Sequence, residues 1–512
     1  MVYITLGLLV ILLVIGEIKG ILNKQFLPKI LTIIITVGIG LLFSIFILDI
    51  KSINMIKYPL DKDLRTYHPY IQQFDAFQKR QLHLDVEPDE RLLELENPYD
   101  PEARKGIFYL WDRAFYNGKY YSYFGIGPII TVYYPFYLLT HQLPSDNLVM
   151  SIFLILTCIF FPLSVFEFTK LFTKKFPVIF NIIGSISATL ATNVFLIARG
   201  YQQFYYMASI SGMAFMSMFL FFLQKAIYSN KGKLIYLFLS GLAYSLVFLS
   251  RLNMALILSI IIIPILIFYI IKNIKEETAI FILFTELFFL AFPVLITLGF
   301  TFWYNHARFG SPLDFGTKYQ LTVSDISKNQ LRLRDFTYAI HHYFLQKPNH
   351  STSYPYLTFS YYRFTNYGHF VYIDANFGLF TTPLTLSLFL SPIIIFLTKE
   401  PLYRKVIILC SLMGLILIAW INFCMGGVIF RYTADLTIIA SFFSLIIIIL
   451  LYDMVKLHLP KIANYLVILL IVIFLIHSCI TCIKLTLFEN GNLVPINPKV
   501  LDIIKSIFPF KQ

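Results

Sequence analysis

Charged side chains are scarce in this chain, and that scarcity excludes most soluble protein classes. Only 13% of the 512 residues are charged, whereas 58% are hydrophobic. Many apolar runs are about 18 residues or longer, which is the length a helix needs to cross a hydrocarbon core. They lack the alternation of apolar and polar residues that the strands of a membrane barrel show. The sequence therefore predicts an all-α polytopic membrane protein. Its clearest apolar runs are residues 30–48, 178–197, 204–223, 280–302, 406–424 and 465–483.

Cysteines and recognisable catalytic motifs are also sparse. The five cysteines lie in or at the ends of apolar runs, where a thiol behaves as a small hydrophobic group. Cys479 and Cys482 share a helix face near His477, but no fourth ligand is in view, so neither a zinc site nor a disulfide framework follows. The chain contains no P-loop, dinucleotide fingerprint, HExxH or nucleophile-elbow motif. No ligand cluster demands a divalent metal, and a metal stays an open alternative.

The net charge of +13 does not by itself indicate a nucleic-acid partner. Lys and Arg are expected in excess in a membrane protein, because they are retained on the cytoplasmic side and orient the helices. No nucleic-acid module and no basic stripe interleaved with aromatics is present. We therefore expect membrane lipids, and not nucleic acid, among the partners.

Short basic loops predict which side of the membrane each segment faces. Six such loops are all cytoplasmic only if residues 126–140 do not cross the bilayer. That stretch is short and contains Pro128 and Pro135, which is typical of a re-entrant or interfacial segment. The prediction is about twelve spans in the plasma membrane, the first at residues 2–15, with both termini outside. The six loops contain Lys19, Lys24 and Lys29; Lys170, Lys174 and Lys175; Lys225, Lys231 and Lys233; Lys272 and Lys275; Lys399, Arg404 and Lys405; and Lys456 and Lys461.

This topology divides the chain into six segments and places all the unusual polar sequence on the outer face. Long loops without structure of their own are uncommon unless functional, and these are rich in Tyr, Pro and Asp, unlike flexible linkers. We therefore expect the active face to be extracytoplasmic. The segments are two helices (1–48), a first outer loop with the re-entrant stretch (49–147), helices (148–302), a second outer loop (303–375), helices (376–484) and an outer tail (485–512).

Three arginines are predicted at outer helix ends. Arg251 lies in the turn SRLN, and Arg431 lies in FRYTADL, four residues before Asp435. Arg308 precedes a turn rich in Gly and Pro. Two purely structural alternatives are open: Arg251 reaches the lipid headgroups, and Arg431 forms an i,i+4 ion pair with Asp435. Two arginines on one side would also suit a bidentate phosphate clamp.

The first outer loop supplies carboxylates, most of them expected to be solvated surface charges. Asp75 differs, because Tyr70, Phe74 and Phe77 recur at helical spacing around it and predict an amphipathic helix on the membrane surface. An apolar neighbourhood disfavours the charged form of a carboxylate, which is how a general base is tuned. His68 is a partner or an alternative base.

The stretch NPYDPEARKGIFYLWDRAFYNGKYYSYFGIGP, residues 97–128, reads as turns followed by a hairpin. Pro98 and Pro101 interrupt helix, and Asn117-Gly118 is a hairpin turn flanked by aromatics. The aromatics suit either the headgroup layer or stacking against sugar rings. They are Tyr109, Trp111, Tyr116, Tyr120, Tyr121 and Tyr123.

Several of these blocks together resemble a known family. The blocks are HPYIQQFDAF, NPYDP, LWDRAFYNGKYYSYFGIGP, SRLN, ARFGSPLDFGTKYQLT and RYTAD, which run from about Asp63 to Asp435. They resemble the multi-spanning glycosyltransferases of the GT-C superfamily, in particular the bacterial membrane proteins related to protein mannosyltransferases and the RgtA/B/C/D-like domain. The resemblance implies a catalytic carboxylate in the first outer loop, a cavity at the outer leaflet and a polyprenyl-phosphate sugar donor.

The chain departs from that pattern at the position of the acid pair. Many relatives carry D-E or D-D directly after the helix that precedes the loop, whereas here Asp49 is followed by Ile50. The first candidate for the catalytic general base is therefore Asp75 and the second is Asp63. Asp49 and His68 are ranked below them. The residues expected to bind substrate are Arg251, Arg431, Arg308, Asp112, Lys119, Tyr120 and Tyr123.

The expected function is transfer of a sugar from a polyprenyl phosphate to a hydroxyl of a glycan, lipid or protein acceptor at the outer face, in cell-envelope assembly. A transporter or flippase for a lipid-linked glycan is the main alternative, and a scaffolding membrane protein is a third. Transporters usually carry polar or broken helices at the bilayer midplane, often in repeated halves. Here the spans hold few ionisable residues, chiefly Glu167 and Glu286.

Overall fold

The computed structural model of the chain describes residues 26–50, 55–172, 177–229, 231–359, 371–373, 376–489 and 493–510. Within these ranges it is an all-α fold with ten helical segments long and apolar enough to cross a membrane. They are α2 (Phe26–Phe46), α6 (Asp146–Phe172), α7 (Val178–Ala191) together with α8 (Val194–Ala198), α9 (Phe204–Tyr228), α10 (Lys233–Ser250), α11 (Leu252–Lys275), α12 (Ile280–Phe309), α14 (Leu402–Gly426), α15 (Phe430–Val455) and α16 (Lys461–Leu487).

The remaining elements are short and belong mostly to the two predicted outer loops. The α and π elements are α3 (Pro69–Gln78), α4 (Glu90–Leu93), η3 (Ile129–Tyr133), α5 (Tyr134–Thr140), α13 (Phe336–Ile340), η7 (His341–Leu345), η10 (Ile393–Leu397) and α17 (Pro498–Ile507). The 3₁₀ turns are η2 (Leu64–Thr66), η4 (Thr317–Tyr319), η5 (Ile326–Lys328), η6 (Leu333–Asp335), η8 (Leu379–Thr381), η9 (Pro383–Leu390) and η11 (Lys456–His458). Three two-stranded antiparallel sheets pair β1 (Ile56–Lys57) with β4 (Gln142–Leu143), β2 (Ala114–Tyr116) with β3 (Lys119–Tyr121), and β5 (Asn349–His350) with β6 (Leu357–Thr358).

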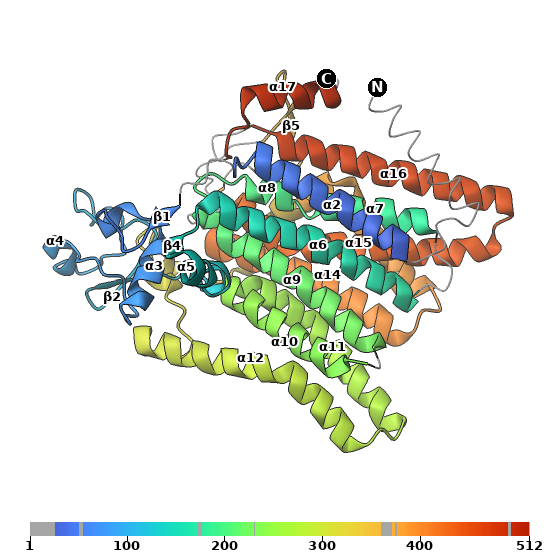
Figure 1. Cartoon of the computed structure of the whole chain (residues 1–512), viewed down its shortest axis with the longest axis horizontal. Coiled ribbons are helices and arrows are strands. Elements are labelled where there is room, and N and C mark those ends of the chain that lie inside the picture. The colour runs from blue at the N-terminus through green and yellow to red at the C-terminus, as the bar shows by residue number, and fades with distance from the viewer. Residues whose placement is uncertain are drawn as a thin grey trace.

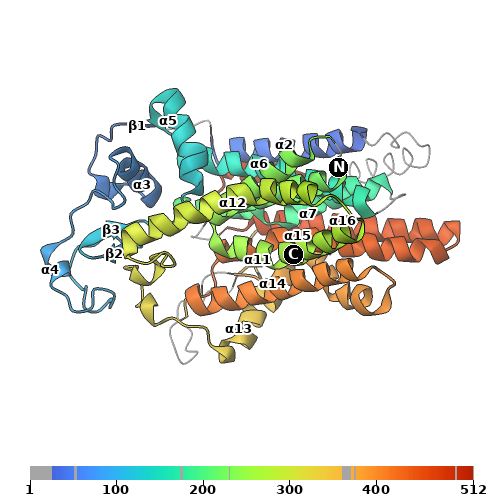
Figure 2. The same ribbon diagram turned by 90° about the horizontal axis from the view of Figure 1, so that it is seen from below.

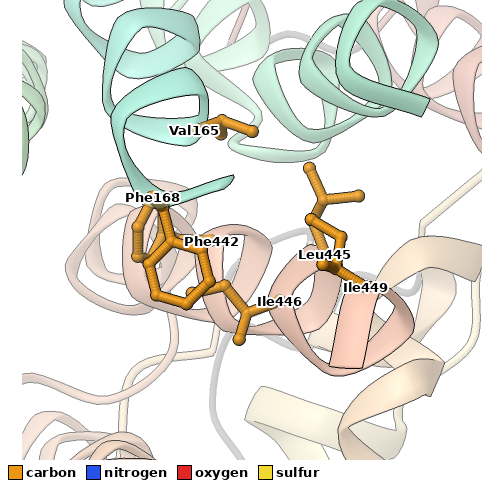
Figure 3. Close-up of a pocket in the computed structure, with 6 residues that line it drawn as sticks. All are labelled: Val165, Phe168, Phe442, Leu445, Ile446 and Ile449. Atoms are coloured by element: carbon orange, nitrogen blue, oxygen red, sulfur yellow. The ribbon is translucent and has the colours of Figure 1, made fainter. Parts of the chain in front are cut away.

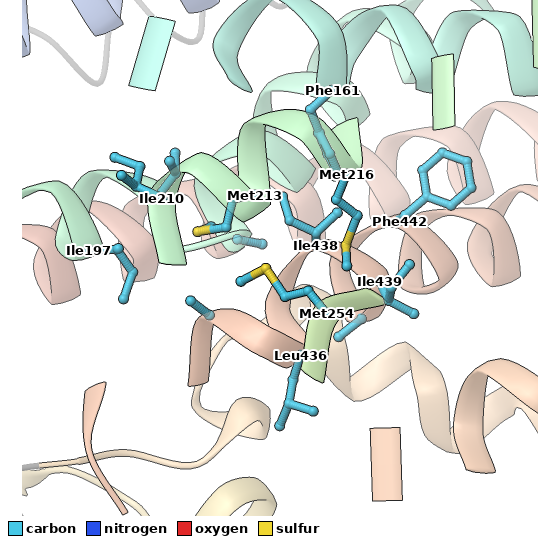
Figure 4. Packing of buried hydrophobic residues seen from close by; sticks show 14 of the residues in the cluster. Phe161, Ile197, Ile210, Met213, Met216, Met254, Leu436, Ile438, Ile439 and Phe442 are labelled. Carbon is cyan, nitrogen blue, oxygen red and sulfur yellow. The ribbon is translucent and has the colours of Figure 1, made fainter. Parts of the chain in front are cut away.

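The long helices run side by side, and the first loop gathers at one end of the bundle (Figures 1 and 2). Helix α15 is central and apolar on all sides, whereas α11 and α12 lie at the margin with most of their surface outward. Met213 and Met216 of α9 and Met254 of α11 meet Ile438 and Ile439 of α15 in the core (Figure 4). The outward apolar faces of the marginal helices are those expected to meet lipid.

Helices α6 and α15 pack tightly enough to exclude water. Val165 and Phe168 of α6 face the apolar side chains of α15, and the gap between the helices has no room for a water molecule (Figure 3). The side chains contributed by α15 are Phe442, Leu445, Ile446 and Ile449. This region is therefore packed core and not a ligand site.

The described residues contain ten helices able to span a membrane, whereas the sequence predicts about twelve spans for the whole chain. The predicted first span, residues 2–15, lies outside the described residues. The predicted ninth, after residue 376, is broken into η8, η9 and η10 by Pro383 and Pro392, because a proline interrupts the α-helical hydrogen bonds. Side chains of the neighbouring helices replace some of these bonds: Ser478 Oγ accepts from the Leu384 amide at 3.2 Å.

The predicted re-entrant stretch is a helix of residues 129–140, formed by η3 and α5, and is not among the ten spans. Twelve residues in a helix rise roughly 18 Å, well short of the roughly 30 Å hydrocarbon core. The basic loops, where described, lie at the opposite end of the bundle from the first loop (Figure 1). There Glu167 pairs with Lys29 at 2.9 Å and with Lys225 at 3.5 Å, and Glu286 pairs with Lys233 at 2.5 Å.

The local predictions for the first loop are partly right. The Asn117-Gly118 turn is confirmed, with both residues at positive φ between β2 and β3. The helix around Asp75 is confirmed as α3, but its placement on the membrane surface is wrong. Residues Pro69 to Ala76 are all buried, and the polar side of the helix is covered because Gln73 donates to the Tyr304 hydroxyl at 2.9 Å.

The two outer loops form one unit. The Asp112 amide donates to Leu321 O at 3.0 Å, and the Leu321 amide donates to Arg113 O at 2.9 Å. The fully buried Arg104 donates to Thr322 O at 2.8 Å. A small apolar cluster beneath these bonds includes Leu321 from the second loop. The loop ends are therefore fixed relative to each other and to α12.

Gly125 and Gly127 let the first loop approach the SRLN turn. A Cβ at Gly125 would lie 2.2 Å from Ser250 O, and one at Gly127 would lie 2.0 Å from Ser250 Oγ. Gly125→Ala is therefore expected to displace the turn that carries Arg251 and to destabilise the protein by about 1–3 kcal/mol. The midpoint of thermal unfolding in detergent measures this. Gly299→Ala, at a helical glycine whose Cβ would meet nothing within 4 Å, is the control; equal midpoints for the two variants would contradict the close approach.

Candidate functional site

The SRLN turn places Arg251 against a buried carboxylate. Arg251 donates to Asp435 of α15 through Nε at 2.5 Å and through Nη2 at 3.1 Å. Asn422 of α14 donates to the same carboxylate at 3.0 Å and accepts from Asn253 at 2.6 Å. Asp435 is fully buried, whereas the Arg251 side chain keeps 16% of its surface exposed. Three helices and the turn are thus joined by one polar network at the loop end of the bundle.

Both structural alternatives predicted for these arginines, a headgroup contact for Arg251 and an ion pair of Arg431 with Asp435, are wrong. Arg251 does not reach toward headgroups, since its fork is occupied by Asp435. Asp435 does not pair with Arg431, although the two are four residues apart, because the carboxylate turns inward to the SRLN turn. Arg431 turns the other way and lies over the ring of Tyr205, with its guanidinium carbon 4.8 Å from the ring centroid.

Arg431 carries a charge without a direct counter-ion. It forms no ion pair and no side-chain hydrogen bond within the described ranges. Its neighbours are the rings of Tyr205 and Tyr432, and the Tyr432 ring also lies 5.1 Å from the Arg251 guanidinium. Two guanidinium groups therefore approach one aromatic ring, and only one of them is neutralised by a carboxylate.

Asp112 is the carboxylate bound by the Tyr205 hydroxyl. The Tyr205 hydroxyl donates to Asp112 Oδ2 at 2.7 Å, and Asp112 is near enough to Arg431 to act on it electrostatically. The backbone of Asp112 is left-handed, with φ +53°, a region that aspartate and asparagine tolerate better than most residues. The bond from its amide to Leu321 O holds this conformation. The turn thus directs the largely buried carboxylate of Asp112 toward Tyr205.

Arg113 and Tyr123 complete the group. Arg113 is buried and donates to Gln72 Oε1 at 2.8 Å, and burial lowers its pKa to about 10, so that it stays cationic at neutral pH. Tyr123 stacks on Phe124 beside Asp112, and burial together with that carboxylate raises its pKa well above the usual range. Its phenol is therefore neutral and available as a hydrogen-bond donor.

Asp75, the sequence's first choice for the base, belongs to a different cluster. Its carboxylate accepts from the Tyr58 hydroxyl at 3.1 Å and lies 3.0 Å from Lys79 Nζ. Tyr70 of the same helix faces Arg251, and five residues along a helix rotate the side chain by roughly 140°, so Asp75 points away from that side.

The other predicted carboxylates and His68 form no ion pair or hydrogen bond with Arg431 in the described residues. Asp63 is exposed and caps η2 by accepting from the Arg65 amide at 2.9 Å. Asp49 is exposed at the end of α2. His68 Nε2 lies 3.0 Å from Asp146 Oδ1, and its ring stacks on Phe204 next to Tyr205.

Arg308, Lys119 and Tyr120 take structural or peripheral positions. Arg308 donates to Ser122 O at 2.8 Å and to Asn305 Oδ1 at 2.9 Å, so it fixes the strand that leads to Tyr123. Within the described residues it shares no hydrogen-bond partner or aromatic ring with Arg251 or Arg431. Lys119 is exposed on β3. Tyr120 is fully buried in the loop cluster, where its hydroxyl accepts from the Leu110 amide at 3.4 Å.

The cluster of Asp112, Tyr123, Arg251 and Arg431 thus unites four of the predicted residues, and we call it the outer cluster after the predicted side of the loops around it. Sequence reasoning missed Tyr205, Tyr432, Asn422 and Arg113. Tyr432 and Arg113 lie beside predicted residues in RYTAD and LWDRAF, but Tyr205 and Asn422 stand in apolar runs without a local signal. Arg199 is separate: it is fully buried and donates to Thr486 O at 2.6 Å and Val494 O at 2.9 Å, which anchors the chain after α16.

No group of three or more His, Cys, Asp or Glu side chains in the described ranges is placed to hold a metal ion. Cys479 and Cys482 both lie in α16.

The fold and the cluster define a multi-pass helical membrane protein with a charged, aromatic site at the loop end of its bundle. Comparison with known proteins finds no matching family model, no matching curated protein and no matching solved structure.

Proposed function

We propose that the protein is an integral membrane glycosyltransferase that moves a sugar from a polyprenyl phosphate to an acceptor hydroxyl at the outer face of the membrane. One observation carries this proposal: Arg431, a cation without an ion-pair partner in the described ranges, lies over the ring of Tyr205, whose hydroxyl donates to the carboxylate of Asp112. A cation and a carboxylate on either side of one small region are what a transfer from a phosphate leaving group requires.

The donor phosphate is assigned to the arginine side of the outer cluster. Arg431 supplies the unmatched charge, and Arg251 supplies a second guanidinium whose position is fixed by Asp435. Arginine forks suit phosphate oxygens. The fork of Arg431 makes no hydrogen bond within the described residues, whereas Asp435 leaves only Nη1 of Arg251 for the phosphate. A lipid-borne phosphate fits this place because the cluster lies where α9, α11 and α15 begin, at the ends of apolar spans.

In the proposed reaction the acceptor oxygen attacks the anomeric carbon of the sugar. The bond from that carbon to the phosphate oxygen breaks, and its electron pair leaves with the phosphate, where Arg431 and Arg251 stabilise the charge. Asp112 accepts the proton of the acceptor hydroxyl, and Tyr205 orients the carboxylate. Asp112 therefore replaces Asp75 as our choice for the base.

The distribution of acidic residues favours transfer over transport. Glu167 and Glu286 pair with lysines at the end of the bundle away from the outer cluster. Asp435, the buried acid of α15, lies near the other end of its span and pairs with Arg251. A transporter usually needs polar groups near the midplane. The direct test is to supply the purified protein with a radiolabelled polyprenyl-phosphate sugar. Transfer of label to an acceptor, or to water, supports the proposal; movement of intact lipid across a vesicle bilayer without cleavage supports the flippase.

Arg431→Gln is expected to weaken donor binding about ten- to a hundredfold, because a charge-assisted contact to the phosphate is worth roughly 1.5–3 kcal/mol. Binding of polyprenyl phosphate to the protein in detergent measures the loss. Arg80→Gln, at an exposed arginine of the first loop, is the matched control. Undiminished affinity in Arg431→Gln would remove this residue from the donor site.

A further inference from the structure

A polar groove of about 460 Å³ opens between the two outer loops, outside the outer cluster. The first loop contributes Asp100 and Pro101, and the second contributes Val323, Asp325, Lys328 and Arg332. None of these residues has a role in the transfer step described above.

The groove is joined to the outer cluster along two paths. On one side, Leu321 is bonded to Asp112 and Arg113, and Val323 follows two residues later, about 7 Å further along an extended chain. On the other side, Asn329 of the groove donates to Met425 O at 2.9 Å. The next residue, Gly426, packs on the ring of Tyr432, where a Cβ would lie 2.6 Å from a ring carbon. The walls of the groove are therefore fixed to the outer cluster on both sides.

The lining of the groove suits a polyhydroxylated molecule. Its charges are balanced, with two carboxylates and two cations, and Lys328 is already paired with Asp325 at 3.2 Å. Asp100 supplies carboxylate acceptors and Arg332 supplies guanidinium donors, and a hydroxyl can both donate and accept. The balanced charge disfavours a polyanion.

Arg332 is the residue of the groove that most specifically indicates a ligand. Its Nη1 is buried and has no hydrogen-bond partner in the described part of the chain, while its backbone carbonyl is fixed by the Trp420 indole N–H at 3.0 Å. A buried donor left unmatched is unfavourable. The Arg332 side chain lines the groove and is only half-buried, so its guanidinium is the cationic donor there that is not already paired.

We propose that this groove binds the acceptor as a saccharide chain, with Arg332 donating to a sugar oxygen. The role of this saccharide as acceptor rests on the proposed function. Its binding is inferred from the residues that line the groove. It assigns the substrate class to a glycan or glycoconjugate, and it places the sugar next to the attacking hydroxyl in the outer cluster.

The test is direct binding of defined probes to the full-length protein in detergent: trisaccharides of a neutral hexose, of N-acetylhexosamine and of a uronic acid, followed by saturation-transfer NMR. A neutral probe is expected to bind the wild type, and Arg332→Gln is expected to weaken it at least about tenfold. Asp100→Asn, which preserves shape, is expected to weaken it as well, and Arg80→Gln is not. Absence of binding by all three probes, preference for the acidic probe, or unchanged binding in both groove variants would overturn the proposal.

The outcome is separable from that of the proposed function. Saccharide binding that needs Arg332, without any turnover of a polyprenyl-phosphate sugar, would keep the groove and reject the transferase. Turnover with an acceptor KM that Arg332→Gln leaves unchanged would keep the transferase and reject the groove. If both hold, the acceptor KM should rise at least about tenfold in Arg332→Gln while the donor KM stays the same.

Discussion

Asp112→Asn is expected to lower the turnover of a polyprenyl-phosphate sugar by about 10²- to 10⁴-fold, because a general base contributes that much to the rate. The amide cannot accept the acceptor's proton, but it can still accept the hydrogen bond from Tyr205. Asparagine also tolerates the left-handed backbone of this position. Donor affinity should therefore survive, and single-turnover kinetics with labelled donor separates the two quantities.

Asp75→Asn is the informative comparison, because sequence reasoning favours Asp75 and the geometry favours Asp112. The Asp75 carboxylate is held by Tyr58 and Lys79, away from Arg431, so we expect its amide variant to keep the rate within a few fold. Loss of turnover in Asp75→Asn with normal turnover in Asp112→Asn would return the role of base to Asp75.

Asp435→Asn is expected to destabilise the protein by about 3–5 kcal/mol, since breaking a buried ion pair leaves an uncompensated charge. Asp435 is fully buried and accepts from both Arg251 and Asn422. The midpoint of thermal unfolding in detergent, compared at one heating rate, measures the loss.

Asp502→Asn is the matched control for that experiment. Asp502 also pairs with a cation, Lys505, at 3.3 Å, but its side chain is 74% exposed, and exposed pairs contribute about 0–1 kcal/mol. The double variant Arg251→Met, Asp435→Leu removes both charges and should regain most of the stability. Equal midpoints for Asp435→Asn and Asp502→Asn would show that the buried pair is not what joins the SRLN turn to α15.

The spans could be predicted from the sequence because a hydrocarbon core demands long apolar runs, which are visible one residue at a time. The hairpin at Asn117-Gly118 was equally local, since its turn needs two residues at positive φ. The surface placement of α3 was wrong because its apolar stripe packs on protein: Tyr70 and Phe74 are fully buried among other aromatic rings. A stripe shows which face is covered and not what covers it.

Of the residues in the candidate site, mainly the charged ones could be predicted from the sequence. Arg251, Arg431 and Asp112 stand out because charge is rare beside apolar runs. Their partners do not follow from spacing: Asp435 lies four residues from Arg431 but pairs with Arg251, 184 positions away. Tyr205 bridges Asp112 and Arg431 from a third helix, and nothing in its own stretch distinguishes it from other tyrosines. Long-range pairing depends on how the helices pack, which local patterns do not determine.

A structure of the protein with a polyprenyl-phosphate sugar bound tests the central claim most directly. The claim predicts the phosphate in contact with the guanidinium groups of Arg431 and Arg251, and the anomeric carbon turned toward Asp112. A donor phosphate bound at the basic end of the bundle, beside Lys29 and Lys225, or one held at the loop end without either arginine, would contradict it.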